Sequence, residues 1–124
     1  MIPPVRALVP MAHVADVERS IRFYAHLGLL PLDTFTPPGA PGPTWAFLRQ
    51  PGGAQLMVTK ASRPLQPETE GFIVYLYTDD VLAMHARLES AGLGPGPIAH
   101  PFYNPKGEFR LQDPDGYAFM IAHT

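Results

Sequence analysis

FRLQDPDGYAFMIA, residues 109–122, consists of two short β-prone runs joined by a tight turn. Pro114 fixes the backbone φ near the value that a turn needs, and Gly116 can adopt the positive φ that other residues resist. The carboxylates of Asp113 and Asp115 can accept hydrogen bonds from nearby backbone amides. These features predict a β-hairpin.

The second run of this hairpin has two distinct faces, because side chains alternate across a strand. One face carries Tyr117, Phe119 and Ile121, and the other carries Ala118, Met120 and Ala122. Both sets are apolar, which is typical of a strand that is covered on both sides. We therefore expect the hairpin to lie in the interior.

The composition is that of a folded, soluble globular domain. The chain has 124 residues, of which 46% are hydrophobic, so it can bury a substantial core. The net charge is −2 and the nine basic residues are scattered, so we expect neither nucleic acid nor a membrane surface as a partner. The sequence has no cysteine, no targeting pattern and no apolar run of membrane length. We expect a cytoplasmic protein.

The first half of the chain predicts a strand, a helix and another hairpin. Asp16 fits the N-cap of the helix and Gly28 its C-terminal stop, with apolar residues at helical spacing between them. Pro10 in the preceding β-prone run indicates an edge strand or a bulge. The expected elements are a strand over 5–14, a helix over 17–27, a short strand over 30–35, a loop over 37–43, and hairpin strands over 44–49 and 54–60.

The second half repeats this order of elements. A β-prone run over 72–78 is followed by a second N-cap, a second helical spacing and a second glycine stop. In the helix region the repeat aligns Asp16-Val17 with Asp80-Val81 and Gly28-Leu29 with Gly92-Leu93. In the last strand the separation between the repeats is one residue shorter, and Gly53 aligns with Gly116 and Met57-Val58 with Met120-Ile121.

Each half is therefore a βαβββ unit of about 55 residues, which is too small to bury a sheet face and a helix alone. We expect the two units to share a core. The predicted fold class is α+β, with a single domain over 1–124 made of two βαβββ repeats. The repeats span about 1–60 and 71–124 and are joined by a proline-rich linker over 61–70.

The chain resembles the vicinal oxygen chelate superfamily, which includes glyoxalase I, bleomycin-resistance proteins and extradiol dioxygenases. The resemblance covers nearly the whole chain. It rests on the internal repeat, on the motif VADVERSIRFY followed by LGL over 14–29, and on DPDGY over 113–117. These motifs specify a fold more strongly than a function, because the superfamily places metal enzymes and metal-free binding proteins on one scaffold.

The resemblance implies a curved half-barrel sheet with a ligand cavity on its concave side. Metal-dependent members present one His or Glu from the first and the last strand of each module. In this sequence those positions fall on Val9, Met57, Ile73 and Met120, and no neighbouring position holds His or Glu. None of the four is a ligand for a hard or borderline divalent metal. We expect no metal and no other cofactor. The four side chains favour a binding protein over an enzyme.

Strand alternation predicts which side chains line the cavity. The set combines flat aromatic rings, adaptable methionines and a few polar groups that could orient a ligand. The alternative is that these aromatic residues fill a closed core. The predicted ligand-binding residues are His13, Trp45, Phe47, Gln55, Met57, Tyr75, Tyr77, Glu108, Arg110 and Met120.

Each of the five histidines can also be assigned a purely structural place. His13 points either to a ligand at the cavity rim or to a backbone carbonyl. His26 and His85 are expected on solvated helix faces or at caps, and His123 lies near the chain end. His100, beside two aromatic residues, is either a cavity lip or an ordinary loop residue. No catalytic triad, Cys-His pair or carboxylate pair can be assembled from the sequence.

Two main functions remain open. The first is a metal-free small-molecule binding protein, similar to the bleomycin-resistance branch, that sequesters a planar aromatic compound such as an antibiotic. The second is a glyoxalase-like lyase, isomerase or ring-cleaving dioxygenase with a divergent active site. A domain without any retained ligand is a third. The resemblance also implies a homodimer, which would cover the strand edges and apolar faces of an open half-shell.

Overall fold

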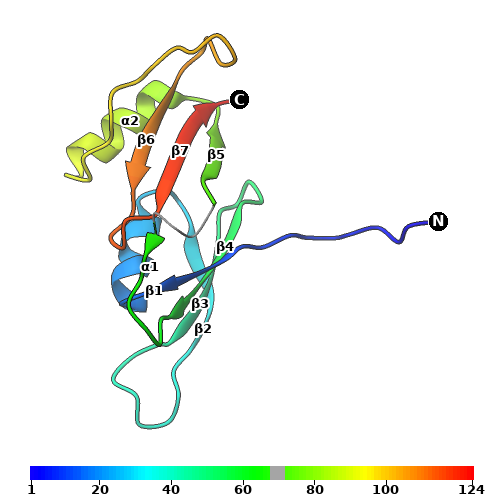
Figure 1. Ribbon diagram of the computed structural model, residues 1–124, viewed down its shortest axis with the longest axis vertical. Helices are drawn as coiled ribbons and strands as arrows, with labels where there is room; N and C mark the ends of the chain where they lie inside the picture. The colour runs from blue at the N-terminus through cyan, green and yellow to red at the C-terminus, as the bar shows by residue number, and fades with distance from the viewer. Residues whose placement is uncertain (68–71) are drawn as a thin grey trace. The chain divides into compact units, whose positions relative to one another are not determined.

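The computed structural model describes residues 1–67 and 72–124. The chain divides into two compact units, Met1–Leu65 and Gln66–Thr124, which we call the first and the second module. Figure 1 shows both along the chain. Part of the predicted linker over 61–70 lies outside the described residues. The boundary between the two modules, after Leu65, falls within the predicted linker.

The first module is a four-stranded mixed sheet with one helix. Its elements are β1 (Met11–Val14), α1 (Val17–Ala25), β2 (Leu30–Phe35), β3 (Trp45–Arg49) and β4 (Gln55–Lys60). The strand order is β1-β4-β3-β2, in which β1 runs parallel to β4 and the other pairs are antiparallel. The predicted hairpin around 50–53 and the short strand over 30–35 are confirmed.

The second module repeats this arrangement with one strand fewer. Its elements are β5 (Val74–Thr78), α2 (Val81–Ser90), β6 (Glu108–Gln112) and β7 (Ala118–His123), in the sheet order β5-β7-β6 (Figure 1). The position equivalent to β2 is reduced to a single bridge between Ala99 and Glu108. Prolines at 95, 97 and 101 lack the N–H that a regular ladder needs, which accounts for the loss. The predicted two-module fold class is confirmed, and neither sheet is closed.

Both helices have the aspartate N-cap and the glycine stop that the repeat predicts. The Asp16 carboxylate accepts a hydrogen bond from the Arg19 amide at 3.1 Å, and Asp80 accepts one from the Ala83 amide at 2.9 Å. Gly28 and Gly92 follow the helices with φ of 78° and 76°, a backbone conformation that favours glycine. The first helix ends at Ala25, two residues before the predicted end, because the last turn tightens before Gly28.

The Asp113 side chain organises the hairpin turn that decides the fold. Its Oδ1 accepts hydrogen bonds from the amides of Asp115 and Tyr117, both at 2.9 Å. Gly116 takes a φ of 93°, as predicted. The expectation that the whole hairpin is interior is only partly right: Phe119 and Ile121 are buried on the helix side. On the other side Ala122 is buried, whereas Ala118 and Met120 are half-buried.

The strand predicted over 5–14 is wrong in its first part. Residues 1–10 form no regular element and leave β1 as an extended tail (Figure 1). Val5 and Leu8 are 81% and 85% exposed. A β-prone run needs a partner strand, and within the described residues this tail has none beyond the bond from the Met57 amide to the Pro10 carbonyl.

The core of each module lies between its sheet and its helix. In the first module Ala46, Leu48 and Val58 are fully buried on the side of the sheet that contacts α1. In the second module Leu111 and Ile121 are buried in the same way. Among the described residues no helix is long and apolar enough to cross a membrane.

Candidate functional site

The face of each sheet that turns away from its helix is here called the open face. In the first module the strand register places Met11, Phe47 and Met57 in one row across this face. The neighbouring row holds His13, Thr59 and Trp45, and Gln55 pairs with Arg49 in the next row. The predicted residues of this module therefore share one face: His13, Trp45, Phe47, Gln55 and Met57.

The second module has an open face with the same rows and different side chains. Tyr75, Met120 and Arg110 form one row, and Tyr77, Ala122 and Glu108 form the next. The rings of Tyr75 and Tyr77 stack with centroids 6.0 Å apart and an angle of 28° between their planes. Tyr75 and Tyr77 are 45% and 63% exposed, so this aromatic pair is not core.

A cleft of about 480 Å³ opens over this part of the second module. Three predicted residues, Tyr75, Tyr77 and Glu108, line it. Arg110 and Met120 share the open face but are not among the lining residues. Six lining residues were not anticipated: Tyr103, Asn104, Pro105, Lys106, His123 and Thr124.

Glu108 is the charged group at the base of the cleft, and it is only 4% exposed. Its backbone is bound to Ala99 by two hydrogen bonds of 2.8 and 2.9 Å, which hold the side chain in place. The Tyr103 hydroxyl donates to Glu108 Oε2 at 3.3 Å. The other carboxylate oxygen, Oε1, is buried without a hydrogen-bond partner.

The Tyr103 phenol is affected by this carboxylate. Partial removal from water, followed by the negative charge of Glu108, raises the pKa of the Tyr103 phenol above its ordinary value. A phenol is protonated at neutral pH even without this shift, so the Tyr103 hydroxyl can donate its hydrogen bond to Glu108.

The segment that carries Tyr103 is held by long-range hydrogen bonds. The Asn104 side chain donates to the His123 carbonyl at 3.2 Å, and the His123 amide donates to the Gly107 carbonyl at 3.0 Å. These bonds join the segment to the end of β7. Sequence periodicity could not reveal them, because Asn104 and His123 are distant in the chain. The only local signal was the run of prolines and aromatics over 101–105.

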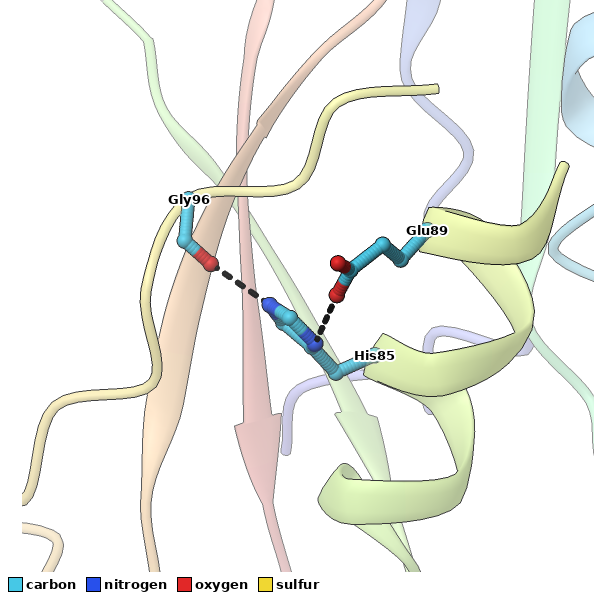
Figure 2. A network of polar contacts seen from close by, with 3 residues as sticks. All are labelled: His85, Glu89 and Gly96. Atoms are coloured by element: carbon cyan, nitrogen blue, oxygen red, sulfur yellow. Dashed lines mark hydrogen bonds and ion pairs between the residues drawn. The ribbon is translucent and has the colours of Figure 1, made fainter. Parts of the chain in front are cut away.

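His85 is not a solvated helix residue, contrary to the sequence expectation. Its Nε2 lies 2.8 Å from the carbonyl oxygen of Gly96, and its Nδ1 lies 3.5 Å from the Glu89 carboxylate (Figure 2). The ring also meets Phe109 edge-on, with centroids 4.9 Å apart. His85 therefore joins α2 both to the loop that replaces a strand and to the sheet, which gives it a structural role.

The remaining histidines vary in their surroundings. His26 is the C-cap of α1, as expected for a cap residue. His100 is exposed and its Nδ1 lies 2.9 Å from the Pro105 carbonyl oxygen, so it is a loop residue rather than a cleft residue. His123 lines the cleft, which its position near the chain end did not suggest. His13 is exposed on the open face of the first module.

The superfamily's metal ligands have no counterpart at the corresponding positions. The register places Met57 and Met120 on the two open faces, as the repeat predicts. Thioether sulfur is a poor ligand for hard or borderline divalent ions, and Val9 and Ile73 offer no donor atom. Over residues 1–67 and 72–124 no group of three His, Cys, Asp or Glu side chains is placed to hold a metal ion. These side chains do not fit a divalent metal.

The model of the Glyoxalase/Bleomycin resistance protein/Dioxygenase superfamily matches residues 8–121, and the chain belongs to this family. A search of the curated proteins finds no match.

Solved structures share the fold over nearly the whole chain. A bleomycin-binding protein complexed with bleomycin is 18% identical with a TM-score of 0.76, covering 97% of this chain and 99% of that one. A bleomycin resistance determinant encoded on the transposon Tn5 is 18% identical with a TM-score of 0.77, covering 97% and 98%. TnmS3, an antibiotic binding protein from Streptomyces sp. CB03234, is 21% identical with a TM-score of 0.77, covering 99% and 98%.

Proposed function

We propose that the protein is a metal-free binding protein that sequesters a planar aromatic small molecule. The observation that carries this proposal is the stacked pair Tyr75 and Tyr77, which stays accessible in a cleft of about 480 Å³. A volume of this size lies in the range of small-molecule sites, about 300–1,000 Å³. Tyrosine rings offer flat apolar faces while their hydroxyls stay in water.

The contrast between the two faces of each sheet supports binding over simple core packing. The helix sides are filled by residues such as Leu48 and Ile121, which are 0% exposed. The aromatic side chains of the open faces are half-buried or exposed instead, among them Trp45, Phe47 and Tyr75. A structure that used these rings only as core would not leave them accessible to water.

The related structures support a small-molecule ligand. Two of them are described as bleomycin-binding and antibiotic-binding proteins, and a third as a bleomycin resistance determinant. Resistance by sequestration needs affinity alone and no chemistry. The absence of metal-binding side chains at Val9, Met57, Ile73 and Met120 fits a protein of this kind.

The test is a binding screen combined with elemental analysis of protein purified without chelators. Planar aromatic compounds, including antibiotics with fused or linked rings, should bind by calorimetry, and native mass spectrometry should recover them unaltered. Tyr77→Ala should weaken binding several-fold, because each aromatic pair contributes about 0.5–1.5 kcal/mol beyond area burial.

Leu82→Ala is the matched control, because Leu82 is 67% exposed on α2 and does not line the cleft. It should bind as the unaltered protein does. One equivalent of tightly held Zn, Ni, Fe or Mn, or turnover of a hemithioacetal or catechol, would contradict the proposal and favour the enzyme alternative.

The same proposal includes a cytoplasmic homodimer. The tail residues Val5 and Leu8 are exposed apolar side chains, and exposed strand edges also favour a partner chain. Light scattering at micromolar concentration should give twice the 13.6 kDa mass of one chain. If the tail forms part of the dimer contact, deletion of residues 1–8 should convert the dimer to a monomer. A full chain that is monomeric would refute the dimer.

A further inference from the structure

The carboxylate of Glu108 has one satisfied and one unsatisfied oxygen. Oε2 accepts the hydrogen bond from Tyr103, whereas Oε1 is buried without a partner. A buried carboxylate oxygen without a donor is costly, because it has lost water and gained nothing in return. Glu108 lines the cleft, so an occupant that brings a hydrogen-bond donor to its carboxylate lowers this cost.

The side chains around Glu108 favour a positively charged donor. Tyr75, Tyr77 and Tyr103 line the same cleft, and the faces of aromatic rings attract cations. A protonated nitrogen next to a flat ring would use both features, since its charge pairs with the carboxylate and its ring stacks on tyrosine.

The protein's own cations do not satisfy this oxygen. Lys106 and His123 also line the cleft, and Lys106 is exposed. Within the part of the chain that the structure describes, neither of them forms an ion pair with Glu108, and Oε1 is left without a donor. The positive charge of the exposed Lys106 repels a cationic ligand in the cleft. Removing this charge should therefore strengthen the binding of a cation.

We infer that the cleft of the second module selects planar ligands that carry a protonated amine, amidine or guanidine, with the Glu108 carboxylate as acceptor of the ligand's N–H. The inference rests on the proposed function and narrows its ligand class. It assigns Glu108 as a specificity-determining residue and places the charged end of the ligand among the three tyrosines.

Benzamidine and benzamide provide a matched pair of probes, since they are nearly identical in shape and differ in charge. Backbone amide shifts of β6, β7 and residues 102–107 in NMR titrations should give an affinity at least about tenfold higher for benzamidine. Glu108→Gln keeps the shape and the backbone bonds to Ala99, and it should abolish this preference. Lys106→Met should increase the affinity for benzamidine.

Two controls separate charge from other effects. Glu89→Gln removes one negative charge outside the cleft and should leave the preference unchanged. Tyr103→Phe removes the hydroxyl donor but keeps the Glu108 charge, so the preference should persist.

The outcomes separate this inference from the proposed function. If benzamide and other neutral planar compounds bind as tightly as benzamidine, or if Glu108→Gln keeps the preference, the inference is overturned and the binding function stands. If no planar compound of either charge binds, both fail.

Discussion

The two modules share a backbone plan and differ in what they present on their open faces. Each begins with a strand, caps its helix with aspartate and stops it with glycine. Each then pairs its first strand with its last in parallel. In the first module a complete strand, β2, follows the helix, whereas in the second module the equivalent segment is a loop with one bridge.

The two open faces carry different side chains at equivalent positions of the repeat. Trp45 occupies in the first module the row position that Glu108 occupies in the second. His13 corresponds to Tyr77 in the same way. The first open face is therefore apolar and flat at the point where the second has a buried carboxylate.

The segment over 103–106 lines the cleft beside the sheet of the second module. It follows the bridge at Ala99 and corresponds in the repeat to the loop over 37–43, which connects β2 to β3 in the first module. The two modules therefore differ in the side chains of this connection as well as in the strand before it. The two modules share the packing of a helix on one side of the sheet. They differ in the side chains of the open face and in one connecting segment.

The largest expected effect separates the helix side from the open face. Ile121→Ala should lower the free energy of unfolding by about 2–5 kcal/mol, because Ile121 is 0% exposed between sheet and helix. Its strand neighbour Met120 is half-buried on the open face, so Met120→Ala should cost less than about 1 kcal/mol. Urea denaturation of both variants measures the difference, and equal losses would mean that the open face is core.

A smaller effect is expected at His85, which has Ile21 as its repeat equivalent in the first module. His85→Ile should cost about 1–2 kcal/mol, since the variant loses the hydrogen bond to Gly96 and the edge contact with Phe109. Hydrogen exchange should accelerate over residues 93–107. Unchanged protection there would show that His85 does not hold the loop.

The helix caps should respond alike in the two modules. Asp16→Ala and Asp80→Ala should each cost about 1 kcal/mol, because each removes an acceptor for a first-turn amide. Asp→Asn at the same positions should cost far less, since Asn also caps helices. Thermal unfolding of the four variants checks this, and a cost confined to one module would break the equivalence.

Much of the fold could be predicted from the sequence because it follows local rules. Caps, glycine stops and turn residues determine the helices and hairpins within a few residues, and strand alternation assigns Trp45 and Tyr75 to the open faces. The predicted strand over 5–14 was too long by residues 5–10, because β-propensity does not supply a partner strand.

The missing parts of the site depend on contacts between distant residues. Tyr103 lines the cleft because Ala99 pairs with Glu108 and Asn104 reaches His123, and neither contact has a sequence period. His85 was misassigned for a related reason, since its partner Gly96 lies in a loop whose path the helix pattern does not define.

The central claim is that the open faces are accessible ligand-binding surfaces, and for the open face of the first module Trp45 emission tests it most directly. Trp45 is the only tryptophan and is half-buried on the open face of the first module. Titration with planar aromatic compounds should change its emission, and Trp45→Ala should weaken their binding by roughly 0.5–1.5 kcal/mol with little change in thermal stability. Emission that no planar compound alters, together with a Trp45→Ala variant that unfolds, would contradict the claim for this face.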